Sequence, residues 1–179
     1  MDCYLSFELS SNDFVTALSV SMSDLTDAYI LLFVAGSAAM LIGGLIVAAG
    51  TTAPVAVSTL PETAAATFLR AFWPRYYALG AWGGAALTLG LGLLAPSSPL
   101  GTAYSGLLTA LAALFTAAMW GSMMMIPSIN RARDTGDHVR FASLHRTVLA
   151  LTGAGLLAGM VFLAALGWVL PGQYMIWMH

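Results

Sequence analysis

LLTALAALFTAAMWGSMMMI, residues 107–126, is an uninterrupted apolar run that leads directly into a dense polar segment, PSINRARDTGDHVRFASLHR, at residues 127–146. As an α-helix the apolar run is about 30 Å long, which is the thickness of the hydrocarbon core of a bilayer. Its many alanines and leucines favour helix, and it lacks the alternation of polar and apolar residues that a membrane strand shows. The two segments therefore predict a transmembrane helix with a polar cap.

Three more apolar runs pass the same test, at Tyr29–Gly50, Tyr77–Leu94 and Thr147–Leu170. In a bilayer, backbone hydrogen bonds must be satisfied inside each segment, which favours helices. The short connection between the second and third runs makes those two helices antiparallel neighbours. We therefore predict an all-α integral membrane protein with a four-transmembrane-helix antiparallel bundle.

The composition supports a membrane protein and excludes other classes. The chain is 59% hydrophobic and 8% charged, whereas a soluble domain carries about 25% charged residues. The net charge of -2 gives no indication of a nucleic-acid partner. The single cysteine, Cys3, excludes an intrachain disulfide framework.

All the basic residues are arginines, and they fall in the two connections that must share one side of the membrane. These residues are Arg70 and Arg75 in the first connection and Arg131, Arg133, Arg140 and Arg146 in the second. The positive-inside rule places both connections in the cytoplasm and both termini outside. We expect a bacterial inner membrane protein with an acidic extracytoplasmic tail (residues 1–28), a four-helix domain (29–170) and a short C-terminal tail (171–179).

The first connection, TLPETAAATFLRAFWPRYY, predicts a short interfacial helix between spans one and two. Thr59 and Glu62 have the spacing of a capping box, and Pro74 is expected to stop or kink the helix. One interpretation is a lipid-facing anchor in the membrane surface, with aromatic residues at headgroup depth. The other is that Arg70 and Arg75 hold an anionic headgroup or substrate.

Small residues predict close packing of the helices. Span two contains the GxxxG pair Gly80 and Gly84, and span four contains Gly155 and Gly159. Span one has similar pairs of small residues around Gly43. We expect these pairs to pack mainly within one chain, with contacts to another subunit as the alternative.

Punctuation residues predict where the helices end. The segment APSSPLG, residues 95–101, is expected to form a turn, Pro127 to close span three, and Pro171 to close span four with the following glycine. Asp137 is a good N-cap for a helix that begins near His138 and continues into span four. The segment DHVRFASLHR is therefore predicted to extend the fourth helix.

Several motifs resemble the transmembrane-protein-205-like family, also catalogued as domain of unknown function 4149. They are APVAVSTL after span one, LRAFWPRYY before span two, and IPSINRARDTGD with RFASLHRTVLAL around the start of span four. The resemblance implies a four-span membrane protein and no settled biochemical activity. Members of that family often carry serine and asparagine after the histidine. Here those places read Thr147 and Thr152 or Gly153, so a polar contact inside span four is missing or replaced.

The two cytoplasmic connections emerge from one face of a narrow bundle, so we predict that their polar residues form one cluster. Local pairs at helical spacing, Arg131 with Asp134 and Arg133 with Asp137, are part of this prediction. We expect Arg146 to bind an anion and His145 to orient it, and the cluster to dock a partner or an anionic lipid. The predicted residues are Arg70, Arg75, Asn130, Arg131, Arg133, Asp134, Asp137, His145 and Arg146.

Metal and cofactor sites are weaker alternatives. His138 and His145 are seven residues apart, about 10.5 Å along a helix, which is too far to share a metal ion. His145 alone is a candidate ligand for haem or a pigment; the alternative is an interfacial histidine bonded to protein groups. Met119 and Met123 are four residues apart, and thioethers bind Cu(I), but methionine also fills gaps in packed cores.

Three functions therefore compete. The first is a non-enzymatic accessory or scaffold subunit of a membrane assembly or homo-oligomer, with other membrane subunits as partners. The second is a small transporter or exporter of a metal or an amphiphile, and the third is a haem- or pigment-binding protein that uses His145. No span contains an acidic residue, which argues against proton-coupled transport. The sequence favours the first function.

Overall fold

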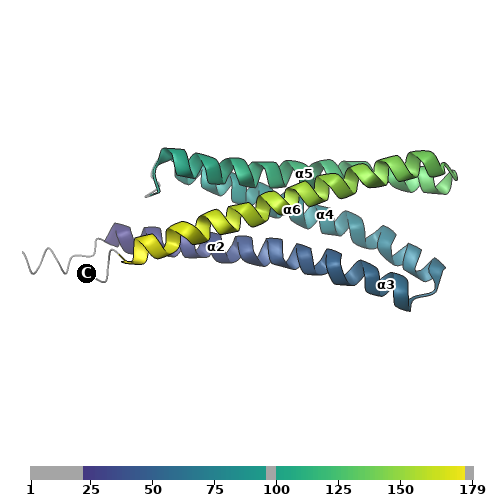
Figure 1. Cartoon of the computed structure of the whole chain (residues 1–179), viewed down its shortest axis with the longest axis horizontal. Coiled ribbons are helices and arrows are strands. Elements are labelled where there is room, and N and C mark those ends of the chain that lie inside the picture. Colours follow the sequence, from purple (N-terminus) through teal and green to yellow (C-terminus); the bar gives the residue numbers. More distant parts are fainter. Residues whose placement is uncertain (1–21, 96–99, 176–179) are drawn as a thin grey trace, which may run out of the picture. The chain divides into compact units, whose positions relative to one another are not determined.

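The computed structural model describes residues 22–95 and 100–175, and side chains for residues 29–95 and 100–168. Within these residues the chain is almost entirely helical (Figure 1). The elements are α2 (Met22–Val47), the π-helical turn η1 (Ala48–Thr52), α3 (Ala53–Thr59), α4 (Glu62–Leu94), α5 (Thr102–Asp134) and α6 (His138–Met175). The predicted fold class is confirmed, because four of the described helices are long and apolar enough to cross a membrane.

The helices are longer than the apolar runs that predicted them. The candidate spans are Tyr29–Thr59, Glu62–Leu94, Thr102–Asp134 and His138–Trp168, each of 31 or 33 residues. A helix of 33 residues is about 50 Å long, so about 20 Å extends beyond a 30 Å hydrocarbon core. In α4, α5 and α6 the arginines lie in this extra length. We call the first part of α4, the last part of α5 and the first part of α6 (residues 62–76, 127–134 and 138–146) the arginine end.

The helix ends predicted at Pro127 and Pro171 are wrong, and of the two outcomes predicted for Pro74, a stop or a kink, the stop is excluded. Pro74 lies inside α4, Pro127 inside α5, and α6 continues past Pro171. A proline removes only one backbone donor, and in membrane helices other groups can satisfy the carbonyls around it. Next to Pro74, the Arg75 guanidinium Nη1 donates to the carbonyl oxygen of Ala71 at 2.6 Å. Because the helices continue through these prolines, they extend beyond the apolar runs.

The segment predicted as a separate interfacial helix is the first part of α4, and it is continuous with span two. The predicted capping box is also wrong. Thr59 ends α3, where its hydroxyl donates to the carbonyl oxygen of Val55 at 2.6 Å. The N-cap of α4 is Pro61, which makes no side-chain cap.

A tight turn joins α5 to α6. As the sequence predicted, α6 begins at His138 and Asp137 caps it. Gly136 has a positive φ of 68°, a conformation that glycine adopts without strain. The Asp137 carboxylate then accepts a hydrogen bond of 2.9 Å from the backbone N–H of Arg140, which caps α6. Of the turn predicted at residues 95–101, residues 96–99 lie outside the part of the chain that the structure describes.

The GxxxG pair of α4 brings α4 and α5 into close contact. A Cβ atom at Gly84 would lie 2.6 Å from Thr116 Oγ1 and 2.9 Å from the Phe115 ring. A Cβ atom at Gly80 would lie 2.9 Å from Met119 Cγ. Only glycine permits this approach, so the motif serves packing within the chain.

The pair in α6 also packs within the chain. Gly155 faces α5, and a Cβ atom at Gly159 would lie 3.0 Å from Ile42 of α2. In contrast, a Cβ atom at Gly43 or Gly44 would meet nothing within 4 Å. The small residues of span four therefore have partners inside the fold, and these two glycines of span one have none among the described residues.

A buried polar contact links α4, α5 and α6 inside the bundle. Thr152 Oγ1 lies 3.1 Å from the Tyr77 hydroxyl, 3.4 Å from Ser122 Oγ and 2.7 Å from the carbonyl oxygen of Val148. Thr152 has one hydroxyl proton, so at least one neighbouring hydroxyl must donate to it. Thr152 thus makes a buried polar contact inside span four.

Candidate functional site

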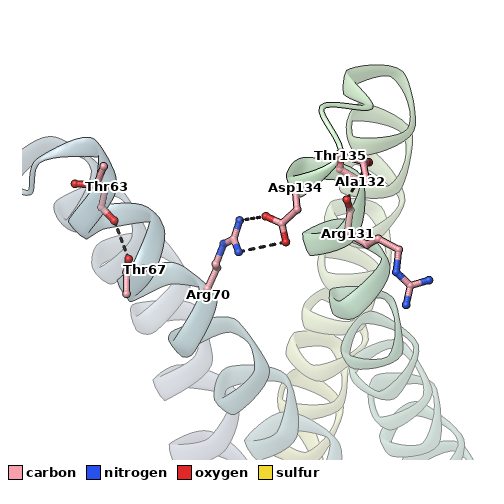
Figure 2. Close-up of polar contacts among 7 residues, drawn as sticks. All are labelled: Thr63, Thr67, Arg70, Arg131, Ala132, Asp134 and Thr135. Atoms are coloured by element: carbon pink, nitrogen blue, oxygen red, sulfur yellow. Dashed lines mark hydrogen bonds and ion pairs between the residues drawn. The ribbon is translucent and has the colours of Figure 1, made fainter.

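An ion pair between Arg70 and Asp134 joins α4 to α5 at the arginine end (Figure 2). The guanidinium makes two contacts with the carboxylate, one of them between Nη1 and Oδ2 at 3.4 Å. Asp134 ends α5, where the helix dipole disfavours a negative charge. The side chains are 42% and 53% exposed, so the pair contributes at most about 1 kcal/mol. The main effect of the pair is to hold the first part of α4 beside the last part of α5, which are both rich in arginine.

A pocket of about 170 Å³ lies beside this ion pair, between α4, α5 and α6. Four polar side chains line it: Arg70, Asn130, Arg133 and His145. The remaining walls are aromatic (Trp73, Tyr77 and Phe141) or aliphatic (Leu69, Ile126, Ile129, Val148 and Leu149). The pocket is therefore apolar over most of its surface and basic at one end.

Helical spacing explains how these side chains reach one pocket. On α4 the lining residues Leu69, Trp73 and Tyr77 are four residues apart, so they share one face. On α5 the lining face runs from Ile126 to Arg133, and on α6 from Phe141 to Leu149, with similar intervals. In each helix one end of this face lies in an apolar run and the other in the arginine end.

His145 is held against Phe141, one helical turn earlier. Their rings are stacked with centroids 5.6 Å apart and an angle of 6° between the planes. The adjoining pocket of about 170 Å³ is smaller than the ~300–1,000 Å³ of small-molecule sites. It does not have room to enclose a porphyrin or pigment macrocycle, so the cofactor interpretation gains no support from the geometry.

Five predicted site residues do not line the pocket, and one of them, Asp134, pairs with Arg70 beside it. Arg75 bonds back to its own helix, and Arg146 Nε donates to the carbonyl oxygen of Ala142 at 3.3 Å. Asp137 caps α6. Arg131 points away from the Arg70–Asp134 pair (Figure 2). The predicted single cluster is therefore divided, with four of its residues lining the pocket and the other five outside it.

The predicted local ion pairs are wrong. Asp134 pairs with Arg70 of α4 instead of Arg131, and Asp137 accepts from the Arg140 backbone instead of pairing with Arg133. The tight turn places Asp137 where its carboxylate accepts a hydrogen bond from a free N–H group in the first turn of α6.

Met119 occupies the centre of the bundle. It is 0% exposed, and its side chain lies against Gly80 and Gly155, from two different helices. Met123 is half-buried. Among the described residues, no group of three or more His, Cys, Asp or Glu side chains is placed to hold a metal ion. The environment of Met119 is that of a packing residue.

Sequence reasoning missed the apolar walls of the pocket. Trp73 and Tyr77 are among the aromatic residues that the sequence predicts at headgroup depth, and the sequence predicts no role for Phe141. The signal was present in the spacing, because aromatic residues four apart on α4 match Phe141 and His145, which are four apart on α6. The spacing alone does not show that these faces of α4 and α6 meet at one pocket.

One comparison with known proteins identifies the family. The family described as Domain of unknown function (DUF4149) matches residues 36–138. This match covers more than half of the chain, and it includes α4, α5 and the turn before α6. The chain therefore belongs to this family. No significant match was found among curated proteins or among solved structures.

Proposed function

We propose that this member of the family is a non-enzymatic accessory or scaffold subunit of a membrane assembly, and that its arginine end docks an acidic partner in the cytoplasm. The observation that carries the proposal is the outer basic surface, which consists of the exposed residues Arg131, Arg140 and Arg146. None of the three forms an ion pair with another described residue. Their positive charges are thus available to a partner.

The backbone that carries the outer basic surface is hydrogen-bonded throughout. This surface lies on two helices joined by a tight turn, and the Arg70–Asp134 pair ties α5 to α4. A preorganised surface loses little conformational entropy when it binds. Arginine is also enriched in protein interfaces, where its planar guanidinium group can form two parallel hydrogen bonds with one carboxylate.

The side chains buried inside the helical bundle support a scaffold role more than the transport of ions or protons. The buried polar side chains of α5 and α6 among the described residues are the hydroxyls of Ser105, Ser122 and Thr152. Hydroxyl groups hold helices together without carrying charge, whereas charged groups inside a membrane protein mark ion or proton pathways.

The proposal includes an orientation and an origin. We place the arginine end in the cytoplasm of a bacterium and both termini outside, because the positive-inside rule applies to every arginine. The motifs in the arginine-rich segments also support placing the chain with the transmembrane-protein-205-like proteins.

Charge reversal of the outer basic surface tests the docking role. The triple variant Arg131→Glu, Arg140→Glu, Arg146→Glu is expected to lose its acidic partner, because the new glutamates repel the acidic groups that the arginines attract. The variant is expected to remain folded, because none of the three arginines forms an ion pair with another described residue. The measurement is the native mass of the complex extracted in mild detergent from cells. The wild-type chain of 18.7 kDa is expected to appear with a stoichiometric partner.

The matched control is Thr102→Glu, which adds a negative charge at the exposed opposite end of α5. It is expected to keep the complex. A wild-type chain that is purely monomeric, or a triple variant that keeps its partner, would contradict the proposal. A mass that is a multiple of 18.7 kDa would identify the partner as a second copy.

A further inference from the structure

We propose that the pocket at the arginine end binds one anionic phospholipid, with the phosphate at Arg133 and the upper part of the lipid between the aromatic walls. This inference does not rest on the proposed docking function, because it uses the pocket and not the outer basic surface.

The charges in the pocket call for an anion. Arg70 is compensated by Asp134, whereas the Arg133 guanidinium has no hydrogen bond or ion pair with any residue in the described part of the chain. No carboxylate lines the pocket, and the remaining polar walls, Asn130 and His145, both carry N–H donors. Charge-assisted bonds from a guanidinium to phosphate oxygens are among the strongest hydrogen bonds in proteins.

The depth of the pocket matches that of a lipid headgroup. Its lower residues, Ile126 and Val148, belong to the apolar spans, and Arg133 lies seven residues beyond Ile126 on the same helix. Seven residues correspond to about 10 Å along a helix. The pocket therefore crosses the boundary between hydrocarbon and headgroups, where a phospholipid has its phosphate above and its first acyl carbons below.

The walls distinguish a lipid from a free phosphate ion. Most of the lining is aromatic or aliphatic, which a small inorganic anion does not use. A volume of about 170 Å³ is close to the ~150 Å³ of a cavity that encloses benzene, so there is room for several carbon atoms. Leu149 lines the pocket and is 56% exposed, which gives a lipid a side entrance from the surrounding bilayer.

The test measures lipid retained by the purified full-length chain. The protein is exchanged into mixed micelles containing either palmitoyl-oleoyl phosphatidylglycerol or the zwitterionic phosphatidylcholine with the same chains, and bound lipid is counted by native mass spectrometry. We expect one phosphatidylglycerol per chain and at least about tenfold weaker retention of phosphatidylcholine. Arg133→Gln should weaken retention of phosphatidylglycerol about tenfold, the effect of one lost charge-assisted bond.

Arg131→Gln is the matched control. It removes the same charge from the same helix end, but Arg131 does not line the pocket and points away from the Arg70–Asp134 pair (Figure 2), so retention should change by less than about twofold. Equal losses in the two variants would mean diffuse attraction of anionic lipids and would overturn the proposal. Equal retention of the two lipids would also overturn it. Complete displacement of phosphatidylglycerol by an equal concentration of inorganic phosphate would reassign the pocket to a free anion.

Folding is checked by the thermal midpoint, read from tryptophan fluorescence. If Arg133→Gln fails to fold, Arg133→Lys decides the question. Lysine keeps the charge but not the planar fork that bonds two phosphate oxygens, so retention should fall about threefold. Unchanged retention in a folded Arg133→Lys protein would overturn the assignment of the phosphate to Arg133.

Discussion

Replacing Gly84 by alanine is expected to lower the free energy of unfolding by roughly 2 kcal/mol, the typical effect of overpacking a filled core. The added Cβ would lie 2.6 Å from Thr116 Oγ1 and 2.9 Å from the Phe115 ring. Neither neighbour can move easily. Thr116 is held by bonds to Ala112 and Thr88, and Phe115 is 1% exposed. The measurement is unfolding in mixed micelles of increasing dodecyl sulfate content, followed by tryptophan fluorescence.

Gly90→Ala is the control for this variant. Gly90 lies in the same helix, and a Cβ there would meet nothing within 4 Å. Alanine favours helix over glycine by up to about 1 kcal/mol, so this variant should be unchanged or more stable. Equal stability of the two alanine variants would contradict the close contact between α4 and α5.

Thr152→Val is expected to lower the free energy of unfolding by about 1–2 kcal/mol. Valine has nearly the same shape as threonine, so the core remains filled. The hydroxyls of Tyr77 and Ser122 lose the partner that they share, and both side chains are buried. The same micelle titration measures the effect.

The corresponding control is Thr147→Val. Thr147 is exposed, and its hydroxyl bonds only to the carbonyl oxygen of Ser143 in its own helix, at 3.1 Å. Removing this bond should change the free energy of unfolding by less than about 0.5 kcal/mol. If Thr152→Val proved as mild as Thr147→Val, the buried hydroxyls would not contribute to holding the three helices together.

The membrane spans could be predicted from the sequence because a helix that crosses a bilayer needs about 20 apolar residues in a row. Such runs are visible directly in the composition of the sequence. The helix ends could not be predicted in the same way. Pro74 and Pro127 mark helix ends when water competes for the backbone, but in this fold the helices continue through both. The N-cap role of Asp137 was predicted correctly because an N-cap is a local interaction between residues three apart.

The candidate site was only partly predictable for a related reason. The sequence showed that two arginine-rich segments share one side, and Arg70 does meet Asp134. It did not show which carboxylate pairs with which arginine, because helical spacing predicts which residues are close within one helix but not between two helices. The pocket depends on three helix faces meeting, so Trp73 and Phe141 acquired a role only in three dimensions.

The claim that the arginine end projects from the membrane on the cytoplasmic side is tested most directly by cysteine labelling of the two ends of α5. In a Cys3→Ser background, Thr102→Cys and Thr135→Cys variants are treated with a membrane-impermeant maleimide in intact cells. Both positions are exposed, at opposite ends of one helix of 33 residues. We predict labelling of the Thr102→Cys variant in intact cells and of the Thr135→Cys variant only after permeabilisation. Labelling of the Thr135→Cys variant in intact cells would contradict the claim.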